Sequence, residues 1–139
     1  MPAVAMLHET DPKQDIIDRV KDALPKIDIY GSDCLVAIYR RPEKTRSGII
    51  LADSTRDEDR FQGKCGLLLK LGPTAYLDED GVKFRDIPLY SWVVFRPSDG
   101  WPMTLNTLQS NLSRDSALEC RIVTDINIRA VIEHPDLIY

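Results

Sequence analysis

The sequence DCLVAIYRRPEKTRSGIIL, residues 33–51, joins two regions of different character. Residues 34–39 form a short apolar run, which is typical of a strand buried on both faces in a small β protein. The residues that follow are mostly charged or hydroxyl-bearing, and among them stand three large aliphatic side chains, Ile49, Ile50 and Leu51. The stretch therefore predicts a buried strand that leads into a long polar connection with an isolated apolar trio.

Four further β-rich runs follow along the chain, and turn-forming Gly, Pro and Asp residues separate them. They cover residues 66–71, 91–95, 118–123 and 130–132. Because the runs are short and several are continuously apolar, they predict a mostly β fold, as a small barrel or a sandwich.

The N-terminal residues follow a helical pattern instead. Thr10 or Asp11 provides a helix start, Pro12 suits the first turn, and Pro25 ends the pattern. The spacing predicts one amphipathic helix over residues 12–24, within an N-terminal extension of residues 1–32 that precedes a β domain of residues 33–139. Its apolar stripe favours packing on a core over a separate partner site, and it consists of Ile16, Ile17, Val20, Ala23 and Leu24.

Composition limits the class of protein. With 139 residues the chain fits one domain, and its 18 basic and 22 acidic residues leave no basic excess for binding nucleic acid. No apolar run is long enough to cross a membrane, and the first residues lack the pattern of a secretory signal, so we expect a cytoplasmic protein. In that compartment the three cysteines, Cys34, Cys65 and Cys120, are expected to be buried reduced thiols.

Catalytic chemistry has no clear candidates in the sequence. His8 and His134 have no partners at metal-ligand spacing, and the seven glycines stand singly as turn residues. The acidic sequence DEDG, residues 78–81, lacks the alternating oxygen ligands of a calcium loop and predicts a hairpin tip. We therefore expect no enzymatic activity, no cofactor and no metal.

The aliphatic trio allows two interpretations. Residues 48–52 could be an ordinary edge strand, or the trio could be a docking element that is buried only in a partner, since its polar neighbours cannot offset their own ordering entropy. Burying three such side chains gains about 1.5–3 kcal/mol each, whereas ordering five residues costs about 1–2 kcal/mol each. One such element would bind weakly, and several linked copies would bind strongly.

Residues 33–139, about three quarters of the chain, resemble a GroES-type co-chaperonin, the lid of the GroEL folding chamber. DCLVAIYRRPEKTRSGIIL is similar to the first strand and mobile loop of that family. GLLLKLGP resembles the next strand and glycine turn of the family. DEDGVKFRDI stands at the place of the family's roof hairpin, and SWVVFRPSDGW stands at the place of another strand and turn. ECRIVTDINIRAVIE resembles its closing strand, Asp-initiated turn and last strand.

The resemblance implies a small GroES-like β-barrel in a heptameric ring, with terminal strands pairing between neighbouring subunits and a long mobile loop on each. Ile49, Ile50 and Leu51 would insert into a groove of an ATP-bound GroEL-type chaperonin, and Gly48 would allow the turn that enters the docked hairpin. The ring would enclose a substrate protein, and ATP would be hydrolysed by the chaperonin alone.

Three departures accompany the resemblance. Residues 1–32 form a longer extension before the first strand than that family has. The helix of this extension could pack outside the ring, shield an edge strand or bind something else. Residues 100–119 form a longer loop, expected to cover the barrel end or to line the chamber, and Tyr90-Ser91-Trp92 replaces a Gly-Asp turn. Such divergence suggests a specialised homologue, and bacteriophages are one known source of such lids. The alternative function is a ring-forming structural or assembly protein, for example on a virion.

Overall fold

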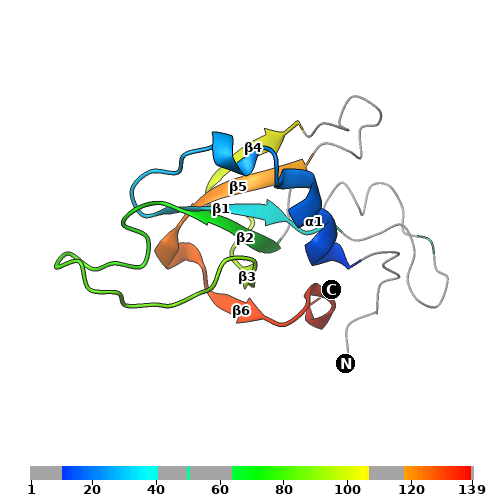
Figure 1. The fold of residues 1–139 in the computed structure, drawn as a ribbon. Coiled ribbons are helices and arrows are strands. Elements are labelled where there is room, and N and C mark those ends of the chain that lie inside the picture. The colour runs from blue at the N-terminus through cyan, green and yellow to red at the C-terminus, as the bar shows by residue number, and fades with distance from the viewer. Residues whose placement is uncertain (1–10, 41–49, 51–63, 107–117, 139) are drawn as a thin grey trace.

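The computed structural model describes residues 11–40, 50, 64–106 and 118–138 (Figure 1). Six strands form one antiparallel sheet in the order β4-β5-β1-β2-β3-β6. Their bounds are β1 Asp33–Ile38, β2 Cys65–Leu71, β3 Trp92–Val94, β4 Trp101–Leu105, β5 Leu118–Thr124 and β6 Ala130–Ile132. The mostly β prediction is confirmed. A closed barrel is not seen in the described part of the chain, because β4 and β6 are separate edges of an open sheet.

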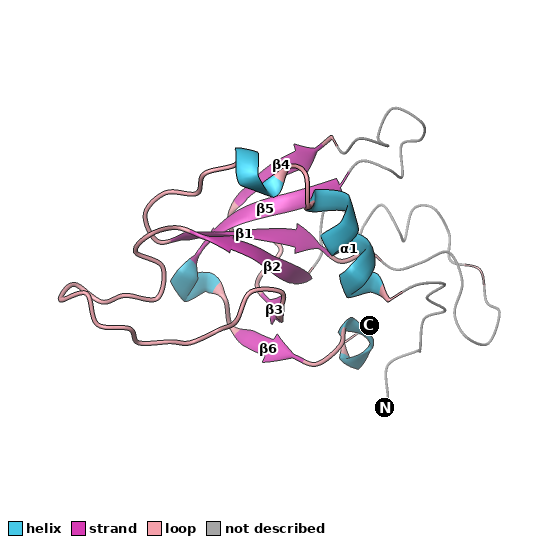
Figure 2. Cartoon of the chain, viewed as in Figure 1, coloured by secondary structure: helices cyan, strands magenta, loops and turns pink. Residues whose placement is uncertain are grey.

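Short helical elements lie around this sheet (Figure 2). Within the described residues they are α1 Pro12–Val20 and three short 3-10 helices, η1 Leu24–Lys26, η3 Asp125–Asn127 and η4 Pro135–Leu137. In the described ranges none of these helices has the length and apolar character that crossing a membrane requires.

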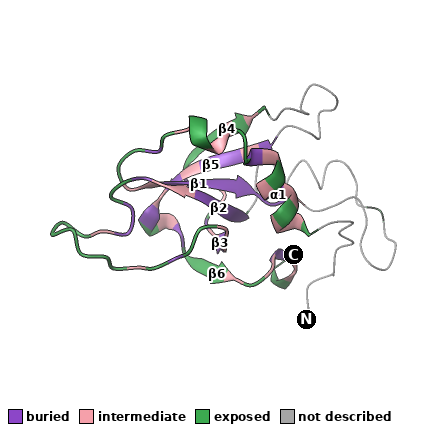
Figure 3. Cartoon of the chain, in the orientation of Figure 1, coloured by how far each residue is buried: buried purple, intermediate pink, exposed green. Residues whose placement is uncertain are grey.

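The central strands are buried on both faces, as their continuous apolar sequences predict. In β1, Leu35 and Ala37 belong to one core cluster, whereas Val36 and Ile38 belong to a second cluster on the other face. Figure 3 shows the same concentration of buried residues along β1, β2 and β5. The sheet therefore has a layer of other elements over each face.

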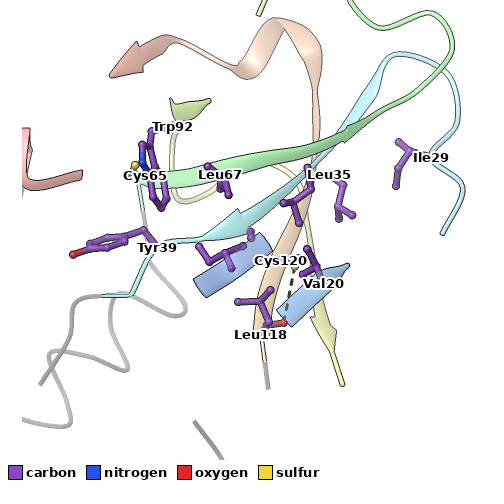
Figure 4. Packing of buried hydrophobic residues seen from close by; sticks show 12 residues of the cluster. Val20, Ile29, Leu35, Tyr39, Cys65, Leu67, Trp92, Leu118 and Cys120 are labelled. Carbon is purple, nitrogen blue, oxygen red and sulfur yellow. Dashed lines mark hydrogen bonds between the residues drawn. The ribbon is translucent and has the colours of Figure 1, made fainter. Parts of the chain in front are cut away.

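The first face is covered by the N-terminal extension. Ile16 and Val20 of α1 are 5% and 0% exposed, and both belong to the first core cluster. In Figure 4, Val20 packs among Leu35, Leu118 and Cys120. The expectation that the apolar stripe faces a core is confirmed, and α1 covers the sheet of its own chain.

The predicted end of this helix was wrong. The α-helix ends at Val20, and a turn leads into η1, Leu24–Lys26, because Pro25 lacks the N–H that an α-helical turn would need there. The predicted start is confirmed, since the Asp11 side chain accepts a hydrogen bond from the Lys13 N–H and Pro12 occupies the first turn.

The second face is covered by residues 72–90, which we call the hairpin arm. Ala75, Tyr76 and Ile87 of the arm pack with Val36 and Val93 of the sheet. At the tip, one Asp78 carboxylate oxygen accepts hydrogen bonds from the N–H groups of Asp80 and Val82. The predicted hairpin tip at residues 78–81 is therefore confirmed, with Gly81 at a positive φ of 78°.

Residues 100–119 are not a continuous loop, which corrects the sequence interpretation. Trp101–Leu105 form β4, which pairs antiparallel with β5, so that Leu105 lies opposite Leu118. This strand was not predicted because it contains Pro102, and proline is depleted in sheets except at edges. The proline is tolerated here because β4 is an edge strand. Residues 107–117 lie outside the described residues.

The three cysteines are free and buried, as predicted. Burial raises the pKa of Cys34 to about 11, and the nearby Tyr76 hydroxyl offsets part of that effect. Burial also raises the pKa values of Cys65 and Cys120, each to about 12, from an ordinary value of 9.0. The thiols are consequently protonated and inaccessible in the folded protein at neutral pH.

We expect these thiols to react with an aromatic disulfide reagent at pH 8 at least about 100-fold more slowly in the native protein than in urea. The free energy of unfolding should also fall as pH rises from about 9 towards 11, because the unfolded state loses thiol protons that the folded state retains. Urea titrations at several pH values measure this slope, and Cys65→Ala should reduce it. Rapid reaction of any thiol in the native protein would contradict the burial.

Candidate functional site

The polar connection that contains the aliphatic trio leaves the sheet between its two central strands. The Tyr39 N–H donates a hydrogen bond to the Cys65 carbonyl oxygen at 2.9 Å, directly beyond the pairing of Ile38 with Gly66. Tyr39 is 2% exposed, and its ring packs edge-on against Trp92 with centroids 5.7 Å apart. The root of the connection is therefore fixed in the core.

Of the four residues predicted to bind a partner, the structure describes one. Ile50 is 64% exposed, although it is a large aliphatic residue. Gly48, Ile49 and Leu51 lie outside the described residues. Most of the Ile50 side chain is therefore not buried by the described residues, which is compatible with a docking element and does not suit a core strand.

Strand register places the connection at a defined end of the sheet. Ile38 of β1 and Leu118 of β5 lie at this end, because Ala37 pairs with Cys120. Cys34 lies at the opposite end of β1 and pairs with Leu71, after which the hairpin arm begins. Figure 1 shows the arm (green) extending far beyond that opposite end. The trio-bearing connection and the hairpin arm therefore leave the sheet from opposite ends.

The edge strand β6 borders a shallow groove that the sequence did not predict. The groove has a volume of about 290 Å³, and it is lined by Arg85, Ile87, Ile128, Arg129, Ala130 and Val131. Val131 is 52% exposed, and among the described strands β6 pairs with β3 alone. The alternating sequence NIRAVIE was the only signal, and it identifies a strand without saying whether that strand is an edge.

The base of the hairpin arm is joined to the β5–β6 turn by buried polar contacts. Asp125 is 3% exposed, and its carboxylate accepts hydrogen bonds from the N–H groups of Tyr76 and Ile126, both at 2.7 Å. Arg85 donates to the carbonyl oxygens of Asp125 and Ile128 at 3.3 and 2.6 Å. These groups are satisfied by structural hydrogen bonds, so they hold the arm against the sheet.

Another buried charge organises the turn between β3 and β4. Arg121 is 8% exposed and donates to the carbonyl oxygens of Pro97 and Asp99, while burial lowers the pKa of its guanidinium. Asp99 in turn forms an ion pair with Arg96 at 3.2 Å. Across residues 11–40, 64–106 and 118–138, no group of three His, Cys, Asp or Glu residues is placed to hold a metal ion.

The backbone just before β3 has an unusual conformation at Tyr90. Tyr90 has a φ of 66°, a left-handed conformation that glycine adopts at less cost. The Tyr90 backbone therefore has a conformation that favours glycine.

A scan against protein-family models finds no match to this chain, and a search of curated proteins finds no match either. Function has to be inferred from the residues and their geometry.

Proposed function

We propose that this chain is a subunit of a co-chaperonin, a ring-shaped lid that binds a GroEL-type chaperonin and encloses a substrate protein. The observation that carries the proposal is the exposed Ile50, which lies in a polar connection rooted between the two central strands. The opposite placement of this connection and of the hairpin arm further supports a lid with a docking end and a roof end. A cytoplasmic location follows from the proposal.

In the proposed mechanism Ile49, Ile50 and Leu51 enter an apolar groove between apical helices of the ATP-bound chaperonin. Gly48 allows the turn that precedes them. The trio occupies the groove in place of the substrate protein, which is released into the closed chamber. The lid contributes binding energy only, and nucleotide hydrolysis belongs to the chaperonin.

A ring suits both the geometry and the energetics. In the described part of the chain β6 is an edge strand with a groove beside it, and such an edge could pair with a neighbouring subunit, as expected for a ring whose terminal strands pair. One docked trio gains about as much free energy as the ordering of its residues costs, so useful affinity requires several loops in one assembly. Because the sequence resembles that of GroES-type co-chaperonins, we propose that the ring has seven subunits.

The alternative is a structural ring or assembly protein. The β6 edge and its groove favour this function equally, because they would join subunits whatever the ring is used for. The two proposals differ in the trio. A structural ring gives Ile50 no nucleotide-dependent partner.

The test is co-sedimentation of the purified protein with a panel of GroEL-type chaperonins, including that of its own host cell, with ATP, with ADP and without nucleotide. A lid should sediment with at least one chaperonin only when nucleotide is present. A free ring that binds none of them under any condition would instead support the structural alternative.

A further inference from the structure

The outer part of the hairpin arm projects away from the sheet. Residues 78–84 are exposed, and Figure 1 shows the arm extending beyond the end of the sheet. Within the arm, the Phe84 N–H donates to the Tyr76 carbonyl oxygen and the Asp78 N–H to the Val82 carbonyl oxygen, both at 2.8 Å. A two-stranded hairpin of this kind is only marginally stable in water by itself. The position of the arm therefore depends on the contacts at its base.

The backbone is strained near both ends of the arm. Tyr76 has a φ of 65° and Tyr90 a φ of 66°, and among the described residues these are the non-glycine residues with a positive φ. A side chain makes this left-handed region costly, so such a conformation persists only where the surrounding contacts enforce it. The arm can thus relax whenever the contacts at its base weaken.

Arg85 joins the arm to the β5–β6 turn at the margin of the groove beside β6. Its guanidinium donates to the carbonyl oxygens of Asp125 and Ile128 at 3.3 and 2.6 Å, and its central carbon lies 5.9 Å from the centroid of the Phe84 ring. Arg85 also lines the groove together with Val131 of β6. Both hydrogen bonds are only partly buried in the single chain, so water competes for them.

We propose that Arg85 is a latch through which assembly of the ring fixes the hairpin arm. The proposal rests on the proposed ring and adds a conformational step to it. A neighbouring copy that fills the groove excludes water from Arg85, and hydrogen bonds are stronger in drier surroundings. The latch then outweighs the strain at Tyr76 and Tyr90. The arm consequently fluctuates in the monomer and is fixed in the ring, so the roof end is completed only on assembly.

The test compares Arg85→Gln with Lys83→Gln. Each variant removes one positive charge from the arm, but Lys83 pairs with Asp86, at 3.1 Å, within the arm itself. Hydrogen exchange with mass spectrometry follows the amides of residues 77–86 in dilute monomer and at concentrations at which sedimentation shows a complete ring. In the unmodified protein and in Lys83→Gln, we expect exchange at least about tenfold slower in the ring than in the monomer. In Arg85→Gln the difference should fall below about threefold.

Two results would overturn the latch while leaving the ring intact. One is equal exchange of the arm in the monomer and the ring of the unmodified protein. The other is an undiminished difference in Arg85→Gln, with exchange faster in both states alike, which is what a merely structural role predicts. If Arg85→Gln does not assemble, Arg85→Lys takes its place, because it keeps the charge and loses the fork of donors. Absence of any ring at high concentration would instead overturn the proposed function.

Discussion

Ile50→Asp abolishes nucleotide-dependent binding to the chaperonin under this account. Ile50 is 64% exposed in the free chain, so most of its side chain can gain apolar contact in a partner. Removing that contact costs about 1.5–3 kcal/mol per loop, and placing a carboxylate in an apolar groove costs several kcal/mol more. Because every subunit of the ring carries the change, the losses accumulate and leave no measurable binding.

The matched control is Val82→Asp, which places the same charge at another exposed aliphatic residue. Val82 is 59% exposed and lies on the hairpin arm, away from the docking end. We expect this variant to bind the chaperonin within about threefold of the unmodified protein, because the roof end makes no contact with the partner in the proposed mode. Titration of labelled ring against chaperonin with ATP gives both affinities. Equal affinities for Ile50→Asp and the unmodified protein would remove the trio from the docking site.

Trp92→Ala is expected to lower the free energy of unfolding by about 3–5 kcal/mol, the largest stability effect we predict. Trp92 is 2% exposed and packs against Tyr39 at the root of the trio-bearing connection. A cavity of indole size cannot collapse there, because Cys65, Leu67 and Ile132 pair with Trp92 or its neighbours through sheet hydrogen bonds. Stabilities of small domains are about 5–15 kcal/mol, so the loss is a large fraction of the total.

The second tryptophan provides the control for this measurement. Trp101 is 77% exposed at the start of β4, and Trp101→Ala should change the free energy of unfolding by less than about 0.5 kcal/mol. Urea denaturation of the three proteins under identical conditions compares them directly. A loss of similar size for both variants would show that the two side chains are buried to a similar extent in solution.

The strands were the most predictable part of the fold. The observed strand Ala130–Ile132 matches its prediction, and the other predicted runs differ from the observed strands by one residue at one or both ends. Short apolar runs between turn residues identify a strand because each turn residue stops the pairing locally. The strand β4 escaped prediction, because Pro102 lies within it and only its position at the sheet edge makes the proline acceptable.

Long-range contacts set the limit of what the sequence predicts. The stripe on α1 predicts that Ile16 and Val20 face a core, but the sheet face that they cover depends on the fold of the whole chain. Likewise, the contacts of Lys70 with Leu24 and Ile27 join residues more than 40 positions apart. The trio was identifiable from its polar neighbours, whereas the groove beside β6 depends on which strand becomes an edge.

Electron microscopy of the protein mixed with its cognate chaperonin tests the proposed lid most directly. With ATP, the account predicts a ring of density that closes one end of the chaperonin and joins it through thin connections at each subunit. The same mixture without nucleotide should contain the two rings as separate particles. Uncapped chaperonin ends in the presence of ATP, at concentrations well above those at which the protein forms its own ring, would contradict the account.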